Sequence, residues 1–375
     1  MYNKLIIIVP REFSTKEYIK SSLKDFIKKN IKLEIWVVKK ILNPPNSIDK
    51  KLLISDKNIQ IRIIDNLDTL SENLTKEKVT TLFDLRIKPN INTKNFFSIF
   101  FNFDFDFMII SGLLTHEISL KYTLFYNFKN FLIKLFFSIN SIEIKHSKYV
   151  FLLGNKCDSK FNFLINSKSI LIRGHHADYD RFLERKENTT EFKKSYFVFI
   201  DQNAPFHQDL IEMDRNDIDA DNYYFSIKNF LEITKKKYNI DYLISPHPRA
   251  DISRLKKYFE NKISDMNTLE TIRQCKFVLC HDSTAVNFAF LFNKPVISIY
   301  DNELANSKYN HLKAIKRFCY RTKSSLKNVH RDEIEDYDFH ISKQFYSEFI
   351  KNFIKCHNEN KKRVDILTEY INFYE

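Results

Sequence analysis

Two short apolar segments, each followed by polar residues, decide how the second half of this chain folds. Residues Asp241–Arg249 read DYLISPHPR, and residues Phe277–Thr284 read FVLCHDST. Each begins with a run typical of a buried strand and ends in side chains that can hydrogen-bond or carry charge. Open α/β sheets bind ligands at the carboxyl ends of their strands. The two segments therefore predict an edge of a sheet suited to holding a phosphate.

The remainder of the chain shows the same alternation of apolar runs and helix-length polar stretches. Continuous β-branched and aromatic runs of this kind predict parallel sheets covered on both faces. The pattern stops in the charged stretch 180–191 and then restarts. The fold class is therefore α/β, with two Rossmann-like domains facing a central cleft, as in the GT-B architecture. The predicted strands are residues 4–9, 33–38, 59–64, 80–85, 105–110, 149–153, 169–172, 196–200, 242–244, 277–280 and 295–300.

The length of 375 residues favours two domains over one. We place the first domain at residues 1–186 and the second at residues 187–341. A helix-rich tail, residues 342–375, is expected to pack back across both.

Composition excludes several kinds of site. With three glycines in the whole chain, no glycine-rich phosphate loop is available, although an AT-rich genome would also deplete glycine. The net charge of +13 is spread along the chain and carries no nucleic-acid-binding signature. Two interpretations of this charge stay open. It could attract the protein to an anionic membrane or an anionic donor substrate, or it could be a basic surface that is merely solvated.

Cysteine usage and the start of the chain point to a reducing compartment. The five cysteines form no CxxC pair, so we expect neither a disulfide framework nor a zinc site. The apolar run at residues 5–9 is too short for a signal peptide. A cytoplasmic protein is expected.

The aromatic segment 120–139 contains Lys121, Lys129 and Lys134. A membrane-spanning helix would bury these charges at a few kcal/mol each, so we do not expect one. Two alternatives stay open: a helix lying at a lipid interface, or a core helix whose lysines face outward.

The candidate site residues follow predicted strands of the second half. His247 lies between two prolines, which restrict the backbone and fix where the imidazole points. Ser283 and Thr284 lie where a helix over 283–292 should begin, where hydroxyls and free amides could hold a phosphate. The alternatives are a histidine that only caps a strand and a serine or aspartate that only caps a helix. The candidate donor-binding residues are Asp201, Gln202, Ser245, Pro246, His247, Pro248, Arg249, Asp282, Ser283 and Thr284.

These motifs resemble the bacterial GT-B sialyltransferases, particularly the lipooligosaccharide sialyltransferase family. In that family a His-Pro motif ends one strand and a later Ser or Thr pair holds the phosphate of a CMP-sugar; the matching residues here are His247-Pro248 and Ser283-Thr284. The resemblance covers roughly residues 195–303 and extends to Kdo and pseudaminic-acid transferases. It implies an enzyme that needs neither a metal nor a cofactor. The Asp/Glu-Asp/Glu-Gly motif of the sialyltransferases is absent, so Kdo, pseudaminic or legionaminic acid is as good a donor sugar as sialic acid.

A second resemblance leads to a different product. Residues 280–284 and 290–297 look like the teichoic-acid glycerophosphotransferases, which use CDP-glycerol and form a phosphodiester. A third alternative is a non-catalytic scaffold of a polysaccharide machine, against which the intact His247 and Ser283-Thr284 argue.

The first resemblance implies an inverting transfer of an ulosonic acid to a surface glycan such as lipooligosaccharide, capsule or O-antigen. His247 would serve the departing phosphate. The first domain would bind the acceptor and supply the base, for which Glu12, Glu117 and Asp178 are candidates, though each could be a solvated carboxylate. Neither a metal site at His175-His176 nor a nucleic-acid partner is expected. The acceptor could be a lipid-linked glycan met at the inner face of the membrane.

Overall fold

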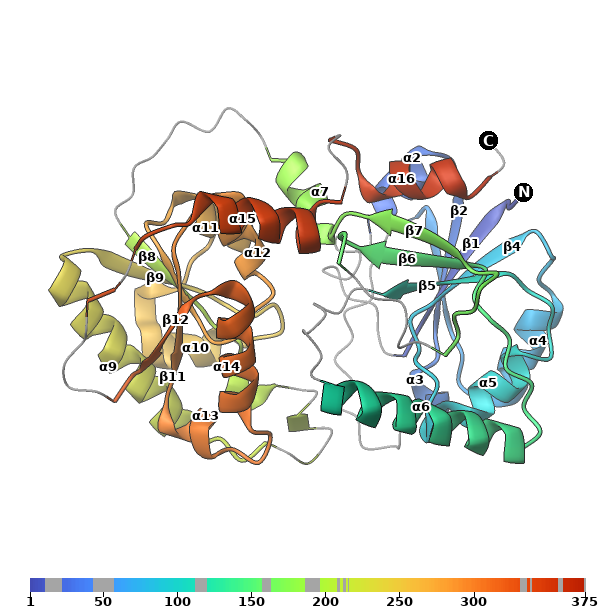
Figure 1. Cartoon of the computed structure of the whole chain (residues 1–375), viewed down its shortest axis with the longest axis horizontal. Coiled ribbons are helices and arrows are strands. Elements are labelled where there is room, and N and C mark those ends of the chain that lie inside the picture. The colour runs from blue at the N-terminus through green and yellow to red at the C-terminus, as the bar shows by residue number, and fades with distance from the viewer. Residues whose placement is uncertain are drawn as a thin grey trace. The chain divides into compact units, whose positions relative to one another are not determined.

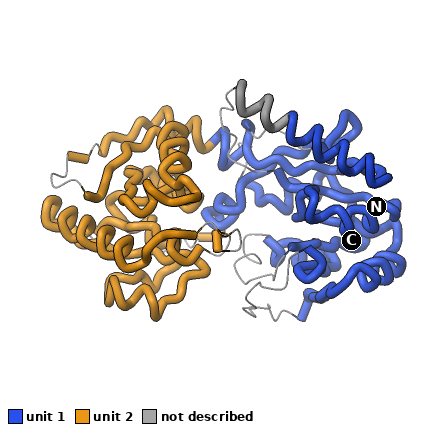
Figure 2. Tube along the Cα trace, turned by 90° about the horizontal axis from the view of Figure 1, so that it is seen from below, with its two compact units in different colours: residues 1–183, 351–375 blue, residues 184–350 orange. Residues whose placement is uncertain are grey.

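The computed structural model describes residues 1–10, 22–42, 57–111, 120–156, 163–185, 196–207, 210–211, 214, 216–330, 336–337, 339–356 and 360–373, and of residues 120–127 only the backbone. The chain divides into two compact units (Figure 2). Unit 1 contains Met1–Leu183 and Lys351–Glu375, and unit 2 contains Glu184–Ile350. Glu12, Glu117 and residues 186–195, which include part of the charged stretch 180–191, lie outside the described residues.

Unit 1 is built on a seven-stranded sheet in the order β3-β2-β1-β4-β5-β6-β7, in which every neighbouring pair is parallel (Figure 1). Each strand lies within two residues of its predicted bounds. The strands are β1 (Lys4–Val9), β2 (Lys32–Val37), β3 (Ile59–Ile63), β4 (Thr81–Leu85), β5 (Phe107–Ser111), β6 (Tyr149–Leu153) and β7 (Ile170–Gly174). The helices are α2 (Leu23–Lys28), α3 (Lys39–Leu42), α4 (Leu67–Thr75), η1 (Ile91–Thr93), α5 (Lys94–Phe100), α6 (Leu120–Ile139), α7 (Ala177–Leu183), η4 (Ile350–Ile354) and α16 (Arg363–Tyr370).

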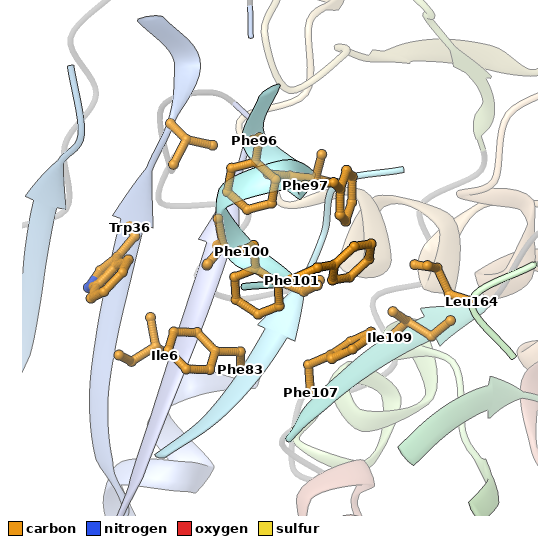
Figure 3. Close-up of a cluster of buried hydrophobic side chains, with 14 of the residues drawn as sticks. Ile6, Trp36, Phe83, Phe96, Phe97, Phe100, Phe101, Phe107, Ile109 and Leu164 are labelled. Atoms are coloured by element: carbon orange, nitrogen blue, oxygen red, sulfur yellow. The ribbon is translucent and has the colours of Figure 1, made fainter. Parts of the chain in front are cut away.

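Both faces of this sheet are buried, which explains the unbroken apolar run of β1. Ile6 and Ile8 enter one core, and Leu5, Ile7 and Val9 enter the core on the opposite face. The first core is rich in aromatic rings (Figure 3), contributed by Trp36, Phe83, Phe96, Phe97, Phe100 and Phe107.

The end of the chain returns to unit 1 and is fixed there by a buried ion pair. Arg363 of α16 pairs with Asp180 of α7, with Nε and Oδ2 3.1 Å apart and both side chains under 10% exposed. Ser22 donates to the same oxygen at 2.8 Å and accepts from Arg363 Nη2 at 2.9 Å. Gly154, at φ +80°, contacts the backbone of Asn352 so closely that no Cβ could be accommodated. The returning segment therefore belongs to the packing of unit 1.

Unit 2 contains a five-stranded parallel sheet in the order β12-β11-β10-β8-β9. Its strands are β8 (Tyr196–Ile200), β9 (Asp241–Ser245), β10 (Val278–Cys280), β11 (Val296–Tyr300) and β12 (Ser325–Asn328). Its helices are η2 (Ala204–Phe206), α9 (Ala220–Tyr238), α10 (Ile252–Phe259), η3 (Glu260–Lys262), α11 (Thr268–Gln274), α12 (Val286–Leu291), α13 (Asn302–Asn306), α14 (His311–Thr322) and α15 (Lys343–Phe349). The first four strands were predicted and β12 was not.

The predicted α/β class with two Rossmann-like, parallel-sheet domains is confirmed, and this is the domain composition of the GT-B architecture. The cleft expected between the domains stays a prediction. Among the helices that the structure describes, none combines the length and the apolar character needed to cross a bilayer.

Candidate functional site

Three adjacent strands of unit 2 bring the candidate residues to one edge. β8 lies between β9 and β10, and its last residue, Ile200, is in register with both Ser245 and Cys280. The loops after these three strands therefore begin side by side. The backbone N–H of Asp201 donates to the carbonyl of Ser245 at 3.0 Å and joins two of them.

His247 is held in one orientation by its own turn. Its Nδ1 accepts from the backbone N–H of Arg249 at 3.2 Å, and its carbonyl accepts from Ala250 N–H at 2.9 Å. Since Nδ1 is an acceptor, the proton of the neutral ring lies on Nε2. The side chain is half-buried, and its ring centre lies 5.7 Å from that of His207. Two imidazoles therefore lie together at this edge, while Pro248 and Arg249 are exposed.

Asp201 directly follows β8 and is almost fully buried. Burial raises the pKa of Asp201 to about 6, although hydrogen bonds from the backbone N–H groups of Asn203, His247 and Gln202 lower it. The Asn203 bond, to Oδ1, is 3.0 Å long. Asp201 thus joins the loop after β8 to the backbone of His247.

Gln202 and Asp282 join the loops after β8 and β10. Gln202 Nε2 donates to Asp282 Oδ1 at 2.9 Å, and the N–H of Asp282 donates back to Gln202 Oε1 at 3.4 Å. Burial lowers the pKa of Arg321, a residue of α14, while the charge of Asp282 opposes that shift. Arg321 was not predicted from the sequence, yet its guanidinium interacts electrostatically with Asp282.

Ser283 and Thr284 lie in a turn, and the prediction that a helix begins at Ser283 is wrong. α12 starts at Val286. The N–H groups of Val286 and Asn287 donate to the carbonyls of Ser283 and Thr284, at 3.3 and 3.1 Å, so these amides are already paired within the turn. Ser283 Oγ accepts from Ala285 N–H at 3.3 Å, and Thr284 is exposed. A phosphate at this turn would have to be held by the hydroxyls and not by these helix amides.

Two polar residues at the same strand ends point into the protein. Ser245 is 1% exposed and donates from Oγ to Thr268 Oγ1 at 3.1 Å. His281 donates from Nδ1 to the Ile299 carbonyl at 2.6 Å and accepts at Nε2 from the Tyr223 hydroxyl at 2.8 Å. Burial lowers the pKa of His281 to about 4. The neutral ring of His281 therefore joins β10 to β11 and α9.

A further histidine reaches the edge from α14, which no motif identified. Burial and the neighbouring His207 lower the pKa of His311 to about 4. Its buried Nε2 has no hydrogen-bond partner among the described residues. His311 thus interacts electrostatically with His207, the neighbour of His247.

Of the predicted bases, only Asp178 lies within the described residues. It is in the first turn of α7, with a 6% exposed side chain, 3.2 Å from His176 Nδ1 and 3.8 Å from Arg181 Nη1. His175 is buried, and its Nδ1 accepts from Cys356 N–H at 3.1 Å. Within the described part of the chain, no three His, Cys, Asp or Glu side chains are grouped as metal ligands. The base and the metal independence stay predictions.

We expect Asp301→Asn to stabilise unit 2 at neutral pH. Burial raises the pKa of Asp301 to about 6, above the ordinary 3.8. The contribution of Asp301 to the free energy of unfolding is therefore complete below pH 3.8. It is lost as the pH rises through 6, because the buried carboxyl must then ionise. Asparagine can still accept the cap bond from Leu304 N–H, at 2.9 Å in the parent. At neutral pH the free energy of unfolding of the variant should exceed that of the parent by about 1–3 kcal/mol. In acid the two free energies should be equal.

Urea unfolding followed by circular dichroism measures this gain. The single tryptophan, Trp36, is buried in unit 1, so a transition that its fluorescence does not report belongs to unit 2. Asp251→Asn is the matched control, since Asp251 caps α10 in the same way but is exposed. Equal pH dependence of Asp301→Asn and the parent would show that burial does not set the Asp301 pKa.

Comparison with known proteins gives structural likeness alone. No protein-family model and no curated protein matches the chain. UDP-GlcNAc 2-epimerase of Methanocaldococcus jannaschii, with UDP-GlcNAc and UDP, is 15% identical at TM-score 0.43, covering 92% of this chain and 98% of its own. The S. aureus MnaA–UDP structure is 13% identical at TM-score 0.47, covering 99% and 98%. The wall teichoic acid polymerase TagF with CDPG is 8% identical at TM-score 0.48, covering 98% and 87%. Nothing about substrate or reaction follows from likeness at this level.

Proposed function

We propose that the protein is a metal-independent glycosyltransferase that moves an ulosonic acid from a CMP-sugar to a hydroxyl of a surface glycan. The observation that carries this is the placement of His247. It is half-buried, fixed in one tautomer and paired with His207, at the edge of the sheet where α/β domains bind nucleotides. In the proposal the donor sugar is Kdo, sialic, pseudaminic or legionaminic acid.

The chemistry needed at this edge is stabilisation of a departing phosphate. The bond from the sugar to the phosphate oxygen breaks as the acceptor oxygen attacks, and negative charge collects on CMP. His247 would donate from Nε2 to that oxygen, with Arg249 and the hydroxyls of Ser283 and Thr284 as further donors. Charge-assisted bonds of this kind are the strongest that a site can offer to a leaving group. One phosphate needs no metal when such donors surround it.

The remaining roles fall to unit 1 in this proposal. It would bind the acceptor and supply the base, for which Glu12, Glu117 and Asp178 stay the candidates. Asp178 is held by two basic side chains, so it would have to leave these contacts to reach a hydroxyl. The reaction fits a cytoplasmic protein working on a glycan at the inner face of the membrane.

Donor consumption distinguishes this function from its alternatives. Purified protein is incubated with a lipooligosaccharide acceptor and, separately, with CMP-Kdo, CMP-sialic acid, CMP-pseudaminic acid, CMP-legionaminic acid and CDP-glycerol, and CMP release is measured. We expect release from at least one CMP-ulosonate and none from CDP-glycerol. Release from CDP-glycerol alone would favour a glycerophosphotransferase, and release from none of the five would favour a scaffold.

A further inference from the structure

The second half of α6 leaves a row of large apolar side chains uncovered. They recur at the spacing that places residues on one face of a helix. We call them the α6 stripe: Phe128, Phe131, Leu132, Leu135 and Ile139, with exposed fractions of 59%, 57%, 47%, 44% and 73%.

The opposite face of the same helix is well packed, so loose attachment does not explain the stripe. Phe137 is fully buried, and its ring lies 6.3 Å from those of Phe97 and Phe163. Ile133 and Phe136 pack on the same aromatic core. The helix runs along one side of unit 1 (Figure 1), and the core beneath it is drawn in Figure 3. Contiguous exposed apolar surface of this kind marks an interaction site.

The charge around the α6 stripe indicates what kind of surface would bind it. The sequence of α6 contains three lysines and no acidic residue. Lys129 and Lys134 are exposed beside the stripe, and Lys94 lies at its carboxyl end, 5.8 Å from the centre of the Phe136 ring. A second copy of this face would bring lysine against lysine. A surface with an apolar interior and anionic headgroups complements both the stripe and its lysines.

We propose that the α6 stripe docks unit 1 onto an anionic lipid bilayer, with the helix lying in the interface. The phenylalanine and leucine side chains would enter the boundary between headgroups and acyl chains. The lysines would stay at the level of the lipid phosphates, which long side chains allow. This docking does not depend on the reaction proposed above.

Vesicle flotation tests the proposal with the full chain. The vesicles contain either phosphatidylcholine alone or equal parts of phosphatidylcholine and phosphatidylglycerol. The parent protein should float with the anionic vesicles, and added salt should weaken binding because it screens the lysines. Phe131→Gln combined with Leu135→Gln should lower the partition coefficient about tenfold or more, since two apolar side chains leave the interface. Lys129→Gln combined with Lys134→Gln should lower it about tenfold or more on anionic vesicles only.

The matched control changes two exposed apolar residues on a helix of unit 2. Phe225 and Ile233 of α9 are 65% and 43% exposed, and their glutamine variants should float like the parent. Because all of these positions are at the surface, each variant should keep the parent's Trp36 fluorescence. Parent protein that stays unbound on anionic vesicles would overturn the proposal. So would equal flotation of all variants, or parent dimers that the Phe131→Gln, Leu135→Gln pair converts to monomers.

Discussion

Replacement of His247 by alanine is expected to lower CMP release about 10²-fold or more while leaving the fold intact. The reason is that the proposed donor to the departing phosphate is lost. The side chain is half-buried at the sheet edge, and its ring nitrogen is bonded within its own turn. Its removal therefore costs little packing. The rate of the chemical step is obtained from single-turnover measurements. They use the donor that releases CMP in the incubations described under Proposed function.

A histidine elsewhere in unit 2 provides the control. His340 is exposed, so His340→Ala should release CMP at the parent rate. An unchanged rate for His247→Ala would remove this residue from the mechanism, and an equal loss in both variants would point to a general effect of histidine removal.

Removal of Asp180 is expected to destabilise unit 1 by about 3–5 kcal/mol. In Asp180→Ala the guanidinium of Arg363 stays buried without its carboxylate, and Ser22 loses an acceptor. This loss is a large part of the free energy of unfolding of a typical domain, which is about 5–15 kcal/mol. Urea unfolding followed by Trp36 fluorescence reports unit 1 directly, because this side chain is fully buried in its core.

An exposed ion pair on the same helix separates burial from charge. Glu369 pairs with Lys361 at 2.9 Å, with both side chains more than 40% exposed. Glu369→Gln should lower the free energy of unfolding by less than about 1 kcal/mol, since ion pairs at the surface contribute little to stability. If Asp180→Ala cost no more than Glu369→Gln, the buried network would not be what fixes the end of the chain to unit 1.

The fold could be predicted where both faces of a strand are buried. In β1 the residues from Leu5 to Val9 are all apolar because each of them lies in one of the two cores. β12 reads SLKN and all four of its residues are half-buried, so this edge strand has no apolar signal. The start of α12 was misplaced because Asp282 and Ser283 have the side chains of helix caps. Those residues instead form a turn that delays the helix to Val286.

The site could be predicted in part, because its loops follow strands that the sequence identifies. The structure places His247 and Gln202 in such loops, as this reasoning expects. Arg321 and His311 come from α14, later in the chain, and only the folded structure brings them near Asp282 and His207. His281 follows a strand like the others, yet it is buried because Tyr223 of α9 covers it. Sequence alone does not show which polar residue at a strand end faces solvent.

The central claim is that the carboxyl edge of the unit 2 sheet binds a cytidine nucleotide through His247. Calorimetric titration of the purified chain with CMP tests it most directly. We predict saturable binding that is at least tenfold weaker in His247→Ala, as expected when a charge-assisted hydrogen bond is lost, and unchanged in His340→Ala. Absence of CMP binding to the parent protein, or equal affinity in the parent and His247→Ala, would contradict the claim.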